Sequence, residues 1–369
     1  MRTGLLALLL AAAAPQEAPQ EASQWKSIEP GLTLGFPADH GAHPAYQTEW
    51  WYLTGQLEDE SGARFGFQFT VFRRGLQPGA PNADESPLRA RQVFAGHLAL
   101  TDVARAETRV AERLQRNSPL AHAAEGELEV VLEDWSLWRG VRDELTLVAA
   151  DPERAFGFEF ALRPAKPLVL HGQGGYSHKG GAPGNAAAYV SWTRLALEGT
   201  LALDGTERIV RGTAWFDHEF GSSVLPEGVD GWDWFGLQLD EPDGRELMLF
   251  ILRDARGEPL EASAATLVER DGTARVLGRA DFTLATGTPG PDTSWTSPIS
   301  GATYPARWAI AVPSVALQLE ITPLVSDCEL VSRATAISYW EGPVAVTGSA
   351  TGRGYAELTG YAGSLSGRF

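Results

Sequence analysis

The chain has 369 residues, and 44% of them are hydrophobic, which is enough to bury a substantial core. This length favours two domains over one. The net charge of −17 provides no basic stripe to neutralise phosphates, so it argues against a nucleic-acid partner and against binding to an anionic membrane surface.

The N-terminus has the three parts of a secretory signal peptide. A short basic start is followed by an apolar stretch at residues 4–10 and by small residues at 11–14. The apolar stretch is shorter than the roughly 20 residues that a membrane-spanning helix needs, so we expect no permanent membrane anchor. Cys328 is the only cysteine, which excludes a disulfide framework and fits a bacterial periplasm or medium. We predict a cleaved signal peptide at residues 1–14, a flexible tether at 15–27, and a periplasmic or secreted protein.

Polar and apolar residues alternate along most of the chain, which is typical of strands with one buried face. Asp-Gly pairs at 204–205, 243–244 and 271–272 indicate the tight turns of antiparallel hairpins. One stretch, residues 86–93, is predicted to be a short helix because a serine and a proline begin it. The sequence therefore predicts an all-β fold of two antiparallel β-barrels or β-sandwiches packed together, with few short helices.

The first aromatic cluster combines Glu49 with Trp50 and Trp51. Neighbouring side chains of a strand point to opposite faces, so only one of the two indoles can face a given cavity, and the other is a packing residue. Glu49 lies either at the rim of a pocket or beside an arginine, for which the Arg73-Arg74 pair is available. All three are candidate substrate-binding residues.

The strongest candidates for catalysis are Asp217, His218 and Glu219, which interrupt an otherwise apolar segment. Such groups are costly unless they are paired, metal-bound or used in chemistry. In a regular strand Asp217 and Glu219 share a face with Trp215, and His218 takes the other face. A carboxyl buried among indoles has its pKa raised toward the range that is useful for acid catalysis. The alternative is a structural ion-pair network.

A second cluster places Asp233 between Trp232 and Trp234, so the indoles share one face and the carboxylate takes the other. Asp233 is either a further catalytic acid or a salt-bridged loop residue. Near the C-terminus, Tyr339 and Glu341 repeat the pattern of an aromatic residue close to an acid. A meeting of these clusters would place the site at the domain interface, where ligand pockets are common. The predicted substrate-binding residues from these later segments are Trp215, Trp232, Trp234, Tyr339 and Glu341.

Other kinds of site have weaker support. Asp39, His40 and His43, or His218 with its neighbouring acids, offer metal ligands, but neither set has a decisive spacing. We predict no metal and no cofactor. The glycine-rich residues 172–184 lack the ending of a phosphate loop and are expected to form a long mobile loop that covers the pocket.

Five segments occur together in a characteristic order: 43–55, 170–179, 191–194, 217–235 and 339–361. With these segments the chain resembles the family of carotenoid 1,2-hydratases and AttH-like proteins, which have two lipocalin-like domains. The resemblance implies an N-terminal β domain at residues 28–223 and a C-terminal lipocalin-like domain at 224–369. It also implies addition of water to isolated carbon-carbon double bonds, or the shaping of polyene cyclisations.

Our first hypothesis is an exported lyase-like enzyme that hydrates, isomerises or cyclises an alkene of a lipophilic small molecule. Asp217 protonates the alkene, and a water positioned by His218 or Glu219 captures a cation that the indole faces stabilise. One alternative is a non-catalytic carrier of a lipophilic ligand, and another is a secreted hydrolase. The sequence sets no oligomeric state.

Overall fold

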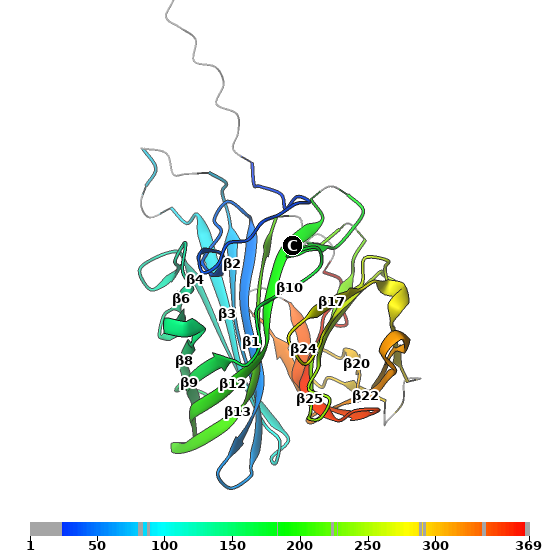
Figure 1. Ribbon diagram of the computed structural model, residues 1–369. Coiled ribbons are helices and arrows are strands. Elements are labelled where there is room, and N and C mark those ends of the chain that lie inside the picture. The colour runs from blue at the N-terminus through cyan, green and yellow to red at the C-terminus, as the bar shows by residue number, and fades with distance from the viewer. Residues whose placement is uncertain are drawn as a thin grey trace, which may run out of the picture.

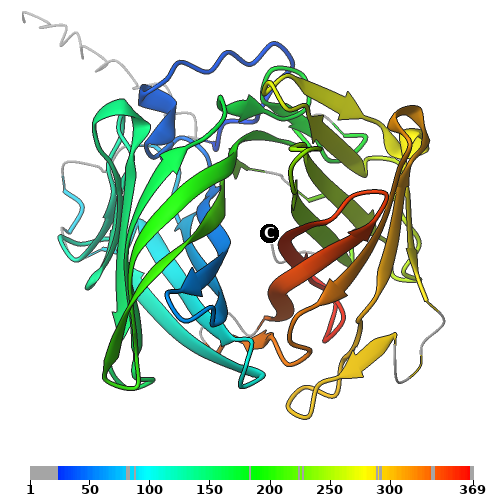
Figure 2. The same ribbon diagram turned by 60° about the horizontal axis from the view of Figure 1, so that its bottom comes forward.

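Two large antiparallel sheets make up the protein in the computed structural model (Figure 1). The structure describes residues 24–79, 84–86, 89–182, 184–222, 225–226, 228–287, 290, 293–333 and 337–365. The predicted signal peptide and most of the predicted tether lie outside these residues. The all-β prediction is confirmed, because the described chain folds into two curled sheets that lie side by side (Figure 2).

The first sheet has 13 strands and begins with hairpins between β4, β3, β2 and β1. From β1 the order continues through β13, β12, β9, β8, β7 and β6 to β5, while β10 and β11 pair with β12. The strands are β1 (Thr48–Asp59), β2 (Arg64–Gly75), β3 (Gln92–Asp102), β4 (Glu107–Arg116), β5 (Ala121–Ala123), β6 (Glu129–Leu132), β7 (Trp135–Arg139), β8 (Leu145–Asp151), β9 (Phe156–Pro164), β10 (Val169–Leu170), β11 (Tyr176–His178), β12 (Ala186–Leu203) and β13 (Thr206–Gly221).

The second sheet has 10 strands in the order β17, β16, β15, β14, β25, β24, β22, β21 and β18, with β23 paired to β24. Its strands are β14 (Gly231–Leu239), β15 (Glu246–Arg253), β16 (Ala264–Val268), β17 (Ala274–Leu277), β18 (Thr283–Thr286), β21 (Trp308–Val312), β22 (Leu317–Pro323), β23 (Glu329–Val331), β24 (Ser338–Gly348) and β25 (Gly352–Leu358). A separate two-stranded sheet contains β19 (Ser294–Thr296) and β20 (Thr303–Pro305).

Helices are few and short in the described part of the chain. They are the three-residue 3-10 helices Ala38–His40, Val141–Asp143, Arg279–Asp281 and Pro313–Val315. The prediction of a helix at residues 86–93 is wrong, because the described residues there are not helical and β3 begins at Gln92. The guanidinium of Arg91 bonds to the carboxylate of Glu85 and to the carbonyl of Pro78. Within the described ranges, no helix has the length and apolar character needed to span a membrane.

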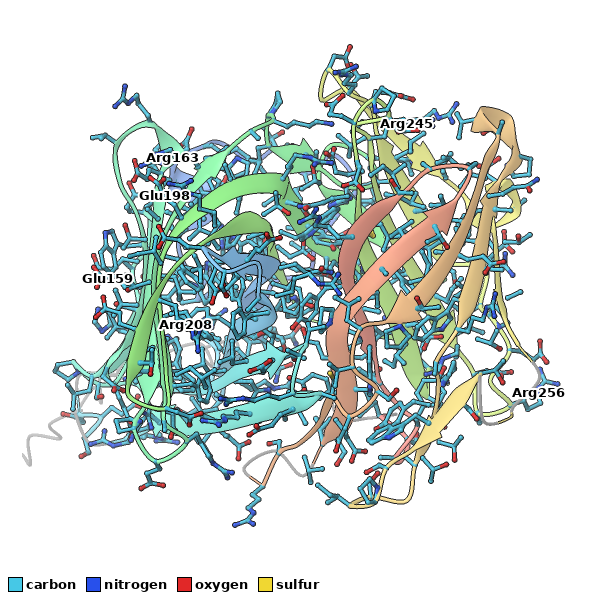
Figure 3. All side chains as sticks on the ribbon, turned by 90° about the horizontal axis from the view of Figure 1, so that it is seen from below. Glu159, Arg163, Glu198, Arg208, Arg245 and Arg256 are labelled. Atoms are coloured by element: carbon cyan, nitrogen blue, oxygen red, sulfur yellow. The ribbon has the colours of Figure 1, made fainter. Side chains whose placement is uncertain are left out.

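Each sheet curls around its own apolar core. The first core contains Trp51 and Trp135, and the second contains Trp308 and Trp340, all fully buried. Ion pairs such as that between Arg163 and Glu198 lie on the outside of the first sheet (Figure 3). Strands β21 and β22 show the predicted alternation of buried and exposed side chains, whereas β1 and β14 are buried along most of their length.

Two glutamines join the sheets to each other. The side-chain amide of Gln56 on β1 donates to the carbonyl oxygens of Val344 and Gly354, both at 2.8 Å. The amide of Gln238 on β14 donates to the carbonyls of Thr193 at 2.9 Å and Ala214 at 3.0 Å. These bonds fix the spacing between the two sheets, and therefore the shape of the space that remains between them.

Candidate active site

A cavity of about 720 Å³ lies between the two sheets. Strands β1, β2, β3, β12 and β13 form one wall, and β14, β15, β24 and β25 form the other. Aromatic side chains come from both walls, namely Trp50, Phe72, Trp232, Trp234 and Phe250. The space is suited to an apolar molecule, and the acids that enter it are therefore poorly hydrated.

Asp217 lies on the wall formed by the first sheet, and only 4% of its surface is exposed. Its carboxyl group accepts hydrogen bonds from the indole of Trp215 at 2.6 Å, from the phenol of Tyr189 at 2.7 Å and from the hydroxyl of Ser191. Burial raises the pKa of Asp217 to about 7, although the three donors oppose the shift. A carboxyl that still holds a proton near neutral pH thus faces the cavity in a fixed orientation.

A chain of hydrogen bonds connects Asp217 to the second sheet. Ser191 is 2.7 Å from the Nε2 atom of His171, whose Nδ1 atom is 2.9 Å from the hydroxyl of Thr266 on β16. Burial lowers the pKa of His171 to about 3, so the ring is neutral. On the other side, the indole of Trp234 donates to the hydroxyl of Tyr189 at 3.0 Å. The orientation of Asp217 therefore depends on both sheets.

Glu219 lies two residues after Asp217 on β13, on the same wall of the cavity, and it has a cationic partner. The Nζ atom of Lys179 is 3.3 Å from Glu219 and lies 4.0 Å from the ring centre of Phe250. Burial raises the pKa of Glu219, and the charge of Lys179 opposes this shift. Lys179 follows β11, which pairs with β12, so the described part of residues 172–184 is attached to the wall of the cavity and is not the separate covering loop that we expected.

The opposite wall carries a second pair of acids, Glu341 on β24 and Glu357 on β25, whose Cα atoms face each other in the strand register. Burial raises the pKa of Glu357 to about 8, although its carboxylate accepts a hydrogen bond from Trp232 at 3.2 Å. Burial and the nearby Glu357 raise the pKa of Glu341 well above its usual range. Tyr339 also lines the cavity, and its hydroxyl is 2.6 Å from the Nδ1 atom of His97.

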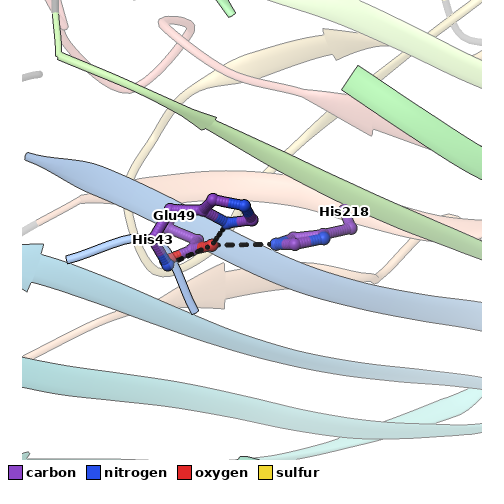
Figure 4. Close-up of side chains that lie close together, drawn as sticks. All are labelled: His43, Glu49 and His218. Carbon is purple, nitrogen blue, oxygen red and sulfur yellow. Dashed lines mark hydrogen bonds and ion pairs between the residues drawn. The ribbon is translucent and has the colours of Figure 1, made fainter. Parts of the chain in front are cut away.

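Glu49, Trp51 and His218 do not line this cavity, which corrects their prediction as site residues. They lie on the other side of β1 and β13, because strand parity places them opposite Trp50 and Asp217. Figure 4 shows Glu49 between His43 and His218. Trp51 stacks on His218 with the ring centres 5.1 Å apart. Of the two neighbouring indoles, Trp50 is the cavity wall and Trp51 is the packing residue.

The carboxylate of Glu49 is the centre of a buried hydrogen-bond network. It is 2.9 Å from the Nε2 atom of His218, 2.8 Å from the Nδ1 atom of His43 and 2.7 Å from the Nε atom of Arg73. Burial alone would raise the pKa of Glu49, but these partners hold the pKa well below its usual range. The arginine partner expected from the sequence is thus Arg73.

His43, Glu49 and His218 also have the ligand types of a metal site, since one donor atom from each lies within 4.8 Å of the others. Hydrogen bonds to Glu49 account for the closeness of these three side chains without a metal ion. Both imidazoles bond to the same carboxylate oxygen, and the guanidinium of Arg73 bonds to the other. A positive charge at this position disfavours a metal ion, so the three side chains are interpreted as a structural network. His40, another of the proposed ligands, packs against Trp192 with the rings tilted and their centres 4.6 Å apart.

Asp233 faces away from the cavity, which corrects its prediction as a catalytic acid. The side chains of Trp232 and Trp234 line the cavity on one face of β14, and Asp233 takes the opposite face. It pairs with the Nε atom of Arg253 at 3.1 Å and accepts a hydrogen bond from Tyr361 at 3.1 Å. Asp233 is therefore the salt-bridged acid of the alternative interpretation.

Sequence reasoning missed several cavity residues. Glu357, Lys179, Tyr189 and Tyr52 line the cavity, and none was predicted as a site residue. The only available signal was their position in or beside the segments that carried the family resemblance. Trp215, which was predicted as a wall, lies behind the cavity surface, where it donates to Asp217 and packs edge-on against Trp234.

The fold and the cavity define a two-sheet, lipocalin-like β protein with an acid-lined pocket between its sheets. The model of the AttH-like family matches residues 27–361, so the chain belongs to the AttH-like family. A solved AttH structure from Nitrosomonas europaea is 33% identical, has a TM-score of 0.80, and is matched over 91% of this chain and 99% of that one. The carotenoid hydratase part of the predicted resemblance stays a prediction.

Two more distant structures show the same fold. Kievitone hydratase from Nectria haematococca is 15% identical with a TM-score of 0.67, and the match covers 93% of this chain and 97% of that one. A structure of CghA with Sch210972 is 15% identical with a TM-score of 0.52, and the match covers 95% of this chain and 96% of that one. A comparison with curated proteins gave no match.

Proposed function

We propose that the protein is a hydratase or lyase-type enzyme that adds water to, isomerises or cyclises an alkene of a lipophilic small molecule in the cavity. The observation that carries the proposal is Asp217, a buried carboxyl in an apolar pocket with a pKa raised to about 7 by burial. A general acid is most effective when its pKa lies near the working pH. Asp217 therefore has the protonation state that is needed to protonate an alkene.

In this mechanism the proton moves from Asp217 to one carbon of the double bond, and the neighbouring carbon becomes a cation. The indole faces of Trp50, Trp232 and Trp234 stabilise the developing positive charge. Glu219, paired with Lys179, accepts a proton from the water that attacks the cation. The two acids are two residues apart on one strand, roughly 7 Å along it, which leaves room for substrate and water between them.

His218 has no place in this mechanism, because it lies on the other side of the sheet. The name of kievitone hydratase, which shares the fold, supports water addition as the class of reaction for this chain. We also propose, from the N-terminal sequence alone, that the protein is exported by a cleaved signal peptide. The two-domain division at residues 223 and 224 stays part of the proposal.

The test is mass spectrometry of lipid extracts incubated with the protein in oxygen-18 water, with wild type compared with Asp217→Asn. We expect a product that is heavier by one labelled water in the wild-type sample alone. The variant Glu320→Gln, which removes an exposed carboxylate on β22 far from the cavity, is the matched control and should behave as wild type. Equal product from wild type and Asp217→Asn would refute the role of Asp217.

Two further outcomes would replace the proposed reaction. A parent compound split into two smaller species, one of them labelled, would indicate a hydrolase. An unlabelled compound that co-purifies equally with wild type and Asp217→Asn would indicate a carrier.

A further inference from the structure

The cavity contains more acids than cations that could neutralise them. Four acids line it, Asp217, Glu219, Glu341 and Glu357, and among the described residues only Glu219 forms an ion pair, with Lys179. Two arginines of β2 also reach the cavity. Arg73 is bonded to Glu49 on the other side of the sheet, and Arg74 donates to the hydroxyl of Thr48.

Glu341 and Glu357 are the most closely spaced of these acids. They are direct cross-strand partners on β24 and β25, and both side chains project into the cavity. Partners of this kind have their Cβ atoms about 5 Å apart, and like charges at this distance repel each other. This repulsion adds to burial in raising the pKa of Glu341, and burial raises the pKa of Glu357 to about 8, so both carboxyls favour the protonated form more than an exposed glutamate does.

Two polar groups at this position lack hydrogen bonds in the part of the chain that the structure describes. Neither carboxyl oxygen of Glu341 has a partner, and neither does the hydroxyl of Tyr52, although each residue is only 5% exposed. The hydroxyls of Tyr52 and Tyr339 are close enough to Glu341 to lower its pKa, but neither contact has the geometry of a hydrogen bond. A buried polar group without a hydrogen-bond partner is destabilising, so an unsatisfied pair in a cavity wall indicates the position of a ligand's polar group.

The surrounding aromatic side chains indicate the charge of that group. The indole of Trp232 reaches Glu357, and Trp50 and Trp234 line the same space. Aromatic faces attract ammonium groups, and this cavity already holds one, since the Nζ atom of Lys179 lies 4.0 Å from the ring centre of Phe250. An ammonium group at this position would donate hydrogen bonds to the unpaired carboxyl oxygens and would also be attracted to the aromatic faces.

We propose that Glu341 and Glu357 form a subsite for the ammonium group of a lipophilic amine, whose hydrocarbon part occupies the aromatic cavity. The subsite does not depend on the reaction proposed above, although the same negative charge favours a carbocation. Binding of the ammonium stabilises the ionised carboxylates, so the protein releases protons to the buffer as the amine enters.

Isothermal titration calorimetry with octylamine and 1-octanol at pH 7 tests the subsite. Measurement in two buffers with different ionisation enthalpies gives the number of protons released. We expect octylamine to bind at least tenfold more tightly than octanol, with release of ~1 proton per bound amine. Equal affinities without proton release would overturn the proposal, and tighter binding of octanoate than of octylamine would assign the cavity to anions instead.

Variants separate the subsite from the proposed reaction. Glu341→Gln and Glu357→Gln should each weaken octylamine binding by about 10- to 100-fold and leave octanol binding unchanged, which also shows that the cavity is folded. Glu320→Gln should keep wild-type affinity for the amine. Asp217→Asn should retain amine binding while it loses product formation. Retained amine affinity in both glutamate variants would overturn the subsite, whereas amine binding by a wild type that forms no product would refute only the reaction.

Discussion

The ionisation of Asp217 makes a prediction about stability that needs no knowledge of the substrate. Burial raises the pKa of this carboxyl from 3.8 to about 7 in the folded protein. The folded protein therefore keeps a proton that the unfolded chain has already released between these two pH values. The stability that this proton contributes is fully present below pH 3.8, falls as the pH rises, and is lost above pH 7.

The size of the effect follows from the pKa shift. Each pH unit between the two pKa values is worth about 1.36 kcal/mol, so the contribution falls by between 2 and 3 kcal/mol from pH 5 to pH 8. Asp217→Asn removes the titration but keeps the shape of the side chain. Its amide oxygen can accept from Ser191 and Trp215, and its amide nitrogen can donate to the hydroxyl of Tyr189. The variant should therefore fold.

Urea unfolding of both proteins at pH 5, 6.5 and 8 measures the effect. Groups that do not interact with Asp217 titrate alike in both proteins, so their contributions cancel in the difference. Glu357 is one exception, because the charge of Asp217 adds to the raised pKa of Glu357, and its contribution is measured separately with Glu357→Gln in both backgrounds. We expect wild type to lose between 2 and 3 kcal/mol relative to Asp217→Asn as the pH rises from 5 to 8. A difference in free energy of unfolding that stays constant across this range would show that Asp217 is already ionised at pH 5, and would remove the basis for its role as an acid.

Three further substitutions test how the protein is held together. Arg73→Met leaves Glu49 buried without its guanidinium and should cost about 3–5 kcal/mol in urea unfolding, whereas a loss below 1 kcal/mol would mean that the network contributes little. Gly66→Ala would place a Cβ atom 2.7 Å from the ring of Pro343 on the other sheet, so we expect the free energy of unfolding to fall by about 1–3 kcal/mol. An unchanged urea midpoint would contradict this close contact. Gln56→Leu removes two hydrogen bonds between the sheets and should lower the free energy of unfolding by about 1–3 kcal/mol. An unfolding temperature equal to that of wild type would show that these two bonds do not stabilise the contact between the sheets.

Strand parity allowed the sequence to predict part of the site. It placed Asp217 and Glu219 on one face and His218 on the other, and it separated Trp50 from Trp51. The structure shows this arrangement because β1 and β13 pair in a continuous register from Thr48 to Asp59.

The sequence could not tell which face lines the cavity, because both faces of these strands are buried. One packs on the core of the first sheet and the other faces the second sheet, so apolar and aromatic residues occur on both. His218 was therefore kept as a catalytic candidate although it lies on the side of the first core, and Asp233 was kept for the same reason although it faces away from the cavity on β14. Glu357 was missed because its proximity to Glu341 depends on the pairing of β24 with β25, which only the fold brings together.

The most direct test of the proposed reaction is the position of solvent hydrogen in the product. Product formed from lipid extract by the wild-type protein in deuterated water should carry one deuterium on carbon, next to the carbon that takes oxygen-18 in labelled water. Asp217→Asn should form no such product. Incorporation of labelled oxygen without carbon-bound deuterium, as hydrolysis of an ester gives, would contradict protonation of an alkene.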